Sequence, residues 1–143
     1  MDLIEDIVRK YRLAPLEGEG GWFRFLTRFS DCNAGSILYL ISRDSFSSLH
    51  RLDTDELWFF LDGGAAEQVL FDEETGTVRR HRLDRDNRSC LAPAGLWQST
   101  RLVGGEWALF STVMCPQFSP AMYSAPTARL LEANPFLKEY LNA

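Results

Sequence analysis

The chain has 143 residues, of which 45% are apolar, with 10 Phe, 4 Trp and 4 Tyr, so it can build a core without a metal or disulfide. The net charge of −5 argues against nucleic-acid or anionic-membrane partners, and three Cys without close spacing predict neither a zinc site nor a disulfide framework. The first residues lack a signal-peptide pattern and no apolar run is long enough to cross a membrane, so we expect a cytoplasmic protein.

The chain is predicted to form one domain, 1–143, in three parts. Residues 1–14 are expected to be helical, because an apolar stripe of helical period runs through Leu3, Ile4, Ile7, Val8 and Tyr11. Residues 21–118 form a predicted barrel. Residues 126–143 form a helical tail in two pieces, which Asn134-Pro135 divides.

The segment 21–118 contains about nine short runs rich in β-branched and aromatic residues, with turn residues between them. The sequence DEETG, residues 72–76, predicts a hairpin, and Gly104-Gly105-Glu106 predicts another tight hairpin. Many short strands at close spacing indicate an all-β sandwich or a closed barrel.

Alternation along the strands assigns side chains to the two faces of the sheet. His50 shares a face with Leu52, and Glu56 shares a face with Trp58 and Phe60. In the segment 96–102, Gln98 lies on the face opposite Trp97. If the barrel interior receives His50, it can also receive the faces that carry Glu56 and Gln98.

These residues resemble a known family. The pattern His50-x-Leu52-x3-Glu56-x6-Gly63, followed by Pro93-x-Gly95-x2-Gln98, resembles the two motifs of the cupin superfamily. The pieces LAPLEGEGGWFR, HRLDTDELW, PAGLWQ and VMCPQF also resemble, in order, a subfamily of small cupins with EGG-x2-R, HR-x4-E-x-W and PAG-x-WQ motifs. The resemblance implies a double-stranded β-helix, the cupin jelly-roll barrel, with short terminal helices. It also implies a homodimer.

The ligand positions of the general cupin motif are only partly filled. His50 and Glu56 occupy two of them, Leu52 and Gln98 occupy the other two, and His81 stands in a polar strand. A catalytic divalent metal usually needs three good protein ligands and an open position. We therefore expect no metal and no other cofactor, although a weak metal held by His50, Glu56 and Gln98 stays open.

Three interpretations of the barrel interior remain. In the first, His50 is a base held by Glu56 in metal-independent epimerase or isomerase chemistry, as in the deoxysugar epimerases that this family includes. In the second, the barrel is a non-catalytic sensor that binds a small polar ligand, or a degenerate cupin. In the third, His50, Glu56 and Gln98 form a structural polar cluster.

The predicted function is binding of a small polar organic ligand, a sugar or sugar nucleotide, with turnover left open. The predicted catalytic residues are His50 and Glu56. The predicted ligand-binding residues are Gln98, Arg24, Arg51, Tyr39, Trp58 and Phe60.

Overall fold

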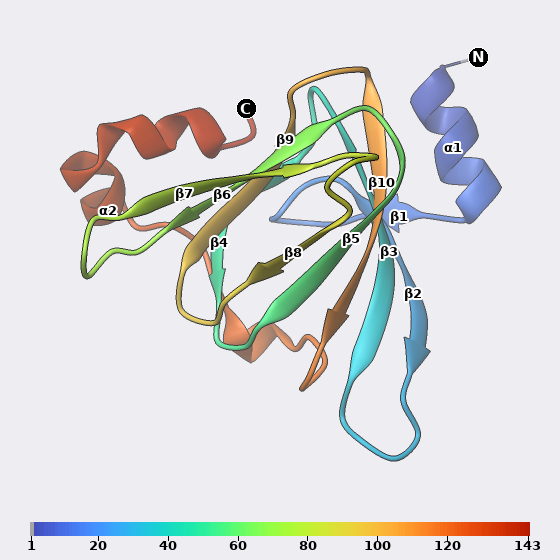
Figure 1. The fold of residues 1–143 in the computed structure, drawn as a ribbon, viewed down its shortest axis with the longest axis horizontal. Coiled ribbons are helices and arrows are strands. Elements are labelled where there is room, and N and C mark those ends of the chain that lie inside the picture. Colours follow the sequence, from blue (N-terminus) through green and yellow to red (C-terminus); the bar gives the residue numbers. More distant parts are fainter. Residues whose placement is uncertain (1) are drawn as a thin grey trace.

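The computed structural model describes residues 2–143, and Met1 lies outside the described residues. Two antiparallel sheets face each other (Figure 1). The larger has the order β1 (Ala14–Pro15), β2 (Trp22–Arg28), β3 (Gly35–Ser42), β10 (Trp107–Met114), β5 (Glu56–Gly63), β8 (Ser89–Ala92). The smaller has the order β11 (Tyr123–Ser124), β4 (Ser47–Leu52), β9 (Trp97–Leu102), β6 (Ala66–Phe71), β7 (Val78–Leu83). The predicted all-β jelly roll with helices near both ends is confirmed.

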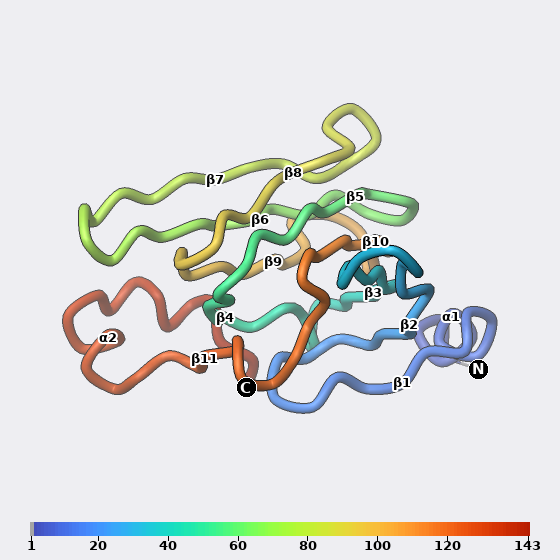
Figure 2. Tube along the Cα trace, turned by 90° about the horizontal axis from the view of Figure 1, so that it is seen from below, coloured from blue at the N-terminus to red at the C-terminus, as the bar shows by residue number. Residues whose placement is uncertain are grey.

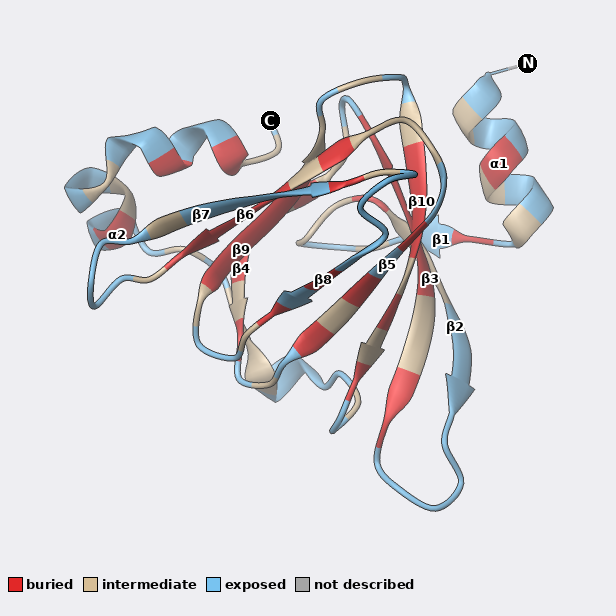
Figure 3. Cartoon of the chain, in the orientation of Figure 1, coloured by how far each residue is buried: buried red, intermediate tan, exposed pale blue. Residues whose placement is uncertain are grey.

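The main core lies between the sheets, where the buried faces of both meet (Figure 3). Phe110 at its centre makes edge-to-face contacts with Trp58 and Phe60, at ring-centroid distances of 5.4 and 6.0 Å. Such aromatic pairs add stabilisation beyond the area that they bury. This rigid centre supports the strands that carry the candidate site.

The N-terminal helix α1 (Leu3–Tyr11) covers part of the outer face of the larger sheet, where Ile7 packs with Leu40 and Leu109. It begins at the Asp2 cap, whose carboxylate accepts the Ile4 N–H. It ends earlier than the predicted residue 14, because Arg12 adopts a left-handed conformation with φ of 56°. The chain then continues directly into β1.

The C-terminal segment covers the outer face of the smaller sheet, on the side of the molecule opposite α1 (Figure 1). Helix α2 (Ala128–Ala133) and the 3-10 helix η2 (Pro135–Tyr140) meet at Asn134, as the sequence predicts. Leu130, Leu137 and Tyr140 pack on Leu49, Val69, Phe71 and Trp97. No helix within residues 2–143 combines the length and apolar character needed to cross a membrane.

Two connections test the turn predictions. The hairpin between β6 and β7 forms as expected, with Gly76 at φ of 73° and its N–H bonded to Asp72 O. The prediction of a hairpin at Gly104-Gly105 is wrong, because β9 and β10 belong to different sheets. The turn instead packs on Gly64 and Ala65, and the N–H groups of Val103 and Gly104 both donate to Ala65 O.

The segment between β10 and α2 contains structure that the sequence did not predict. A short 3-10 turn, η1 (Pro120–Met122), leads into β11, which pairs with the edge strand β4. Tyr123 on β11 is thereby placed opposite Leu52. This added strand closes the side of the barrel beside His50.

Candidate functional site

A cavity of about 340 Å³ opens on the inner face of the larger sheet. Strands β2, β3, β5 and β10 form its wall, and the segments 16–19 and 117–123 form its rim. Most of the wall is apolar, and the titratable groups at its surface are three carboxylates and two tyrosines. The lining residues are Leu16, Glu17, Glu19, Phe23, Phe25, Gly35, Ile37, Tyr39, Leu52, Glu56, Trp58, Thr112, Met114, Gln117, Phe118, Pro120 and Tyr123.

Three of the eight predicted site residues line this cavity: Glu56, Tyr39 and Trp58. All three side chains are buried, and the ring of Trp58 packs edge-on against Tyr39 with centroids 5.7 Å apart. Glu56 therefore sits at the base of a wall made largely of aromatic rings.

His50 and Gln98 lie side by side on paired strands behind the cavity wall. Both are buried, and the structure shows no hydrogen-bond partner for His50 Nε2 or Gln98 Oε1. Tyr123 is stacked on the imidazole, with ring centroids 5.4 Å apart and planes 14° apart. Tyr123 and Glu19, rather than His50, are the groups that reach the cavity surface.

The remaining three predicted residues lie elsewhere. Phe60 is part of the core beneath Phe110. The Arg24 guanidinium donates to Tyr11 O on the α1 side of the larger sheet, at 2.8 Å. Arg51 lies on the outer face of the smaller sheet, 4.8 Å from the ring of Trp97 and 3.8 Å from a carboxylate oxygen of Glu73.

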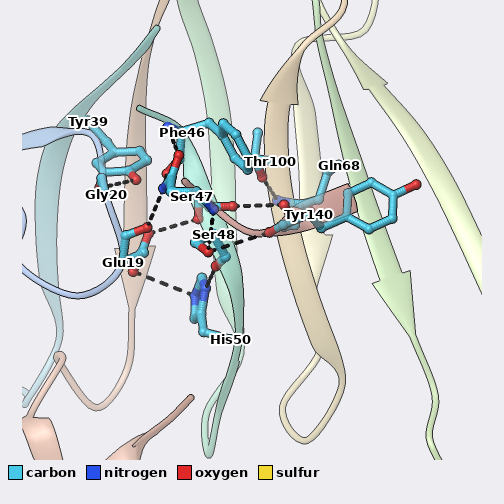
Figure 4. Close-up of polar contacts among 12 residues, drawn as sticks. Glu19, Gly20, Tyr39, Phe46, Ser47, Ser48, His50, Gln68, Thr100 and Tyr140 are labelled. Carbon is cyan, nitrogen blue, oxygen red and sulfur yellow. Dashed lines mark hydrogen bonds and ion pairs between the residues drawn. The ribbon is translucent and has the colours of Figure 1, made fainter. Parts of the chain in front are cut away.

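Glu19 is the site residue that the sequence analysis missed. Its carboxylate accepts a hydrogen bond from Ser47 Oγ at 2.8 Å, and its other oxygen lies 3.6 Å from His50 Nε2 (Figure 4). Its backbone carbonyl accepts the Ser48 N–H at 2.9 Å. Glu19 therefore connects the rim of the cavity to the strand that carries His50.

Glycines on the C-terminal side of Glu19 allow its loop to approach the barrel this closely. Gly20 and Gly21 have φ angles of 102° and 72°, which side chains rarely adopt. A Cβ on Gly21 would lie 2.6 Å from Tyr39 Oη, and one on Gly20 would collide with Asn142 and Phe46. Tyr39 Oη instead donates to Gly20 O at 2.6 Å. The run EGEGG was the available sign of this loop.

A β-bulge in β4 brings Ser47 and His50 to the same carboxylate. Residues three apart on a regular strand face opposite ways, but the pairing with β9 shifts between Ser47 and His50. Ser47 and His50 consequently both contact Glu19. Leu49, between them, packs outward with the C-terminal helices.

The protonation of His50 is partly fixed by its backbone contact. Its Nδ1 lies 2.7 Å from Ser48 O, and because a carbonyl only accepts, Nδ1 carries the hydrogen. In the neutral imidazole, Nε2 is then the unprotonated atom, and it faces Glu19. The Nε2 atom lies 3.6 Å from the Glu19 carboxylate, beyond hydrogen-bond distance.

Glu56 is held in an environment that disfavours its charge. Burial raises the pKa of Glu56 to about 7, and the nearby charge of Glu19 adds to this effect. His50, Thr112 and Trp58 lower the pKa by smaller amounts. Trp58 Nε1 lies near this carboxylate but makes no hydrogen bond of ordinary geometry. Glu56 therefore changes its protonation close to neutral pH.

Asn142 fastens the Glu19 loop to β4. Its side-chain N–H groups donate to Glu19 O at 3.2 Å and Phe46 O at 2.7 Å, and its side-chain oxygen accepts the Phe46 N–H at 3.1 Å. Its own N–H donates to Ser48 Oγ at 3.2 Å. The chain beyond η2 thus ends beside the loop that follows β1 (Figure 2).

The donor set does not fit a catalytic divalent metal. Within residues 2–143, no three His, Cys, Asp or Glu side chains gather in a metal-binding arrangement. Leu52 lies beside His50 where the cupin motif has a second ligand, and its apolar side chain lines the cavity. His50, the Glu56 carboxylate and the neutral amide of Gln98 give only two good ligands, which is too few for such a site.

The buried charge of Glu56 predicts a pH-dependent stability. Because folding raises the pKa of this acid, its stabilising contribution is full below about pH 4.5 and is lost as pH rises through about 7. Glu56→Gln removes the ionisation, so it should increase the free energy of unfolding at pH 8 by on the order of 3 kcal/mol, and by much less at pH 5. Urea unfolding at both pH values measures this. A change equal at both, or shared by the exposed control Glu106→Gln, would contradict it.

The Asn142 contacts predict a local effect at the loop. Asn142→Ala removes the acceptor of the Phe46 N–H and two donors, so it should lower the free energy of unfolding by about 1–3 kcal/mol. Amide exchange of Phe46 should become faster than in the wild type. Asn33→Ala, on an exposed loop, is the matched control. Unchanged protection of Phe46 would show that Asn142 does not hold the loop.

Comparisons with known proteins agree with this architecture. A family model described as "Cupin superfamily (DUF985)" matches residues 5–125. A hypothetical protein from Leishmania major is 21% identical with a TM-score of 0.85, and covers 97% of this chain and 98% of its own. A protein from Shewanella oneidensis is 19% identical with a TM-score of 0.87, and the match covers 99% of this chain and 98% of that protein's chain.

A more distant match is oxalate decarboxylase from Bacillus subtilis, at 15% identity and a TM-score of 0.64. It covers 93% of this chain, which corresponds to only 38% of that enzyme, so the likeness concerns the fold alone. No curated protein matched the sequence. Because the family model spans most of the strands described above, the chain belongs to the cupin superfamily, in the family designated DUF985.

Proposed function

We propose that this cupin barrel binds a small organic ligand in the cavity of the larger sheet. The observation that carries the proposal is the cavity itself, in which about 340 Å³ of space is enclosed by apolar and aromatic walls around the polar groups of Glu19, Glu56 and Tyr39. Small-molecule sites are commonly built in this way, with a few convergent polar groups in an apolar pocket.

The charged residues near the cavity restrict the chemical class of the ligand. A sugar nucleotide carries a diphosphate, which proteins bind with Arg, Lys or helix N-termini. Arg24 and Arg51, the predicted anion-binding residues, lie on other faces of the sheets. Among the residues that line the cavity there is no Arg or Lys. The proposed ligand therefore carries no phosphate. An unphosphorylated sugar or alcohol is consistent with the cavity, because sugar rings stack on aromatic faces.

A cavity-filling variant tests this proposal. Ile37 lines the cavity from β3, so Ile37→Phe should occupy ligand volume and abolish binding. Monosaccharides and small neutral alcohols serve as probes, and the indole N–H signal of Trp58 in protein NMR spectra reports on them. Binding should shift this signal in the wild type and in the control Leu91→Phe, which changes an exposed residue of β8. Shifts that persist in Ile37→Phe, or that occur only elsewhere, would contradict the proposal.

Acid–base chemistry is the second candidate, because two proton-holding groups lie at the cavity. Glu19 lies at the cavity surface with its carboxylate 3.6 Å from His50 Nε2, and Glu56 titrates near neutrality. A general base is most effective with a pKa near the working pH. In this arrangement Glu19 would contact the substrate as the base of a metal-independent isomerase or epimerase reaction, and His50 would position Glu19 from behind.

Proton exchange tests this candidate without a known substrate. A panel of aldoses and ketoses is incubated with the protein in D₂O, and incorporation of deuterium beside the carbonyl is followed by NMR. The wild type should accelerate exchange for some sugars. Glu19→Gln and His50→Gln should each lower the rate about 10²–10⁴-fold, and Glu106→Gln should not. Absence of exchange with the wild type, or full activity in both variants, would refute the chemistry.

A further inference from the structure

The charges around the cavity are unbalanced. Glu17, Glu19 and Glu56 all line it, whereas no lining residue carries a permanent positive charge. Arg28 contacts the lining residue Gln117, but it is exposed and its guanidinium donates to that side chain rather than to a carboxylate. His50 lies behind the wall, with its Nε2 3.6 Å from Glu19.

Glu56 is the group most affected by this imbalance. It is buried, and among the described residues no ion pair to it is found. Burial of a carboxylate without a cation is costly, and a charge of opposite sign nearby removes much of that cost. The site therefore lacks a positive charge that a ligand can supply.

The walls suit the same kind of ligand. Phe23, Phe25, Trp58, Phe118 and Tyr123 surround the space with aromatic rings. The negative face of an aromatic ring attracts an organic cation, most strongly when water is excluded. The same rings accommodate an apolar body. A hydrated metal ion gains nothing from such walls, and the side chains do not supply a metal-binding set.

We propose that the cavity takes a small organic cation, a protonated amine with an apolar or aromatic body, whose ammonium group lies against the carboxylates of Glu19 and Glu56. This inference rests on the proposed binding function and names the ligand class. The ammonium donates hydrogen bonds to carboxylate oxygens, and the body of the ligand contacts the aromatic wall.

The proposal predicts a proton linkage. The cation prefers ionised Glu56, whose pKa is about 7 in the free protein. Ligand affinity should therefore increase by about tenfold between pH 6 and pH 8, as the carboxylate loses its proton. The affinity for a neutral ligand should not show this increase with pH.

Three probes with one carbon skeleton separate charge from shape. They are 2-phenylethylamine, 2-phenylethanol and phenylacetate, titrated into the wild-type protein by calorimetry at pH 6 and pH 8. The amine should bind at least about tenfold more tightly than the alcohol at pH 8, and phenylacetate should bind more weakly than both. The double variant Glu19→Gln/Glu56→Gln should lose this advantage of the amine over the alcohol. Glu106→Gln should behave as wild type.

The outcomes distinguish this inference from the function on which it rests. Binding of the alcohol as tightly as the amine, or tighter binding of phenylacetate, would overturn the cation and leave the binding cavity in place. If none of the three probes binds, the proposal of an organic cation is also overturned. The NMR experiment with sugars and alcohols then decides whether the cavity binds a ligand at all. Thermal unfolding tests whether the double variant is folded. If the double variant is unfolded, Glu56→Gln alone, which should be more stable than the wild type, must lose most of the preference for the amine.

Discussion

Each strand at the centre of the smaller sheet has to bury both of its faces, and much of the structure follows from this requirement. One face of β4 and β9 carries His50 and Gln98 toward the barrel interior, and the other carries Leu49 and Trp97. The second face can be covered only by another apolar element, and α2 with η2 provides it. These helices cover the hydrophobic face and run toward the Glu19 loop. They thereby place Asn142 beside the rim of the cavity, where its side chain donates to Glu19 O.

The unsatisfied polar groups of the interior support the proposed ligand site. A purely structural network would satisfy its members, because unpartnered buried polar groups are costly. Here His50 Nε2, Gln98 Oε1 and Trp58 Nε1 lack hydrogen-bond partners, and two carboxylates share one enclosed region. The aromatic core around Phe110 offsets this cost and holds the strands in place while the cavity stays open.

Strand alternation and turn residues predicted an all-β sandwich or barrel, the hairpin at Asp72–Gly76 and the opposite faces of Trp97 and Gln98, because these features depend on local backbone geometry. The jelly-roll topology was implied by the resemblance of the motifs to cupins. The site was harder to predict. Glu19 reaches His50 because a β-bulge and two glycines with positive φ bring separate segments together. The alternation of apolar and polar residues along the sequence does not predict the bulge or the path of the glycine loop. Arg51 adjoins His50 in sequence, so alternation already indicated that it faces away. The roles assigned to these residues remain predictions.

The contact between Glu19 and Asn142 joins positions 123 residues apart in the chain. Because synthesis runs from the N-terminus, the strands up to β10 are made before Tyr123 and Asn142. The Glu19 loop would then lack the amide that fastens it and the strand β11 that brings Tyr123 over His50. A nearly finished barrel would therefore lack two supports around the cavity until Tyr123 and Asn142 have been synthesised.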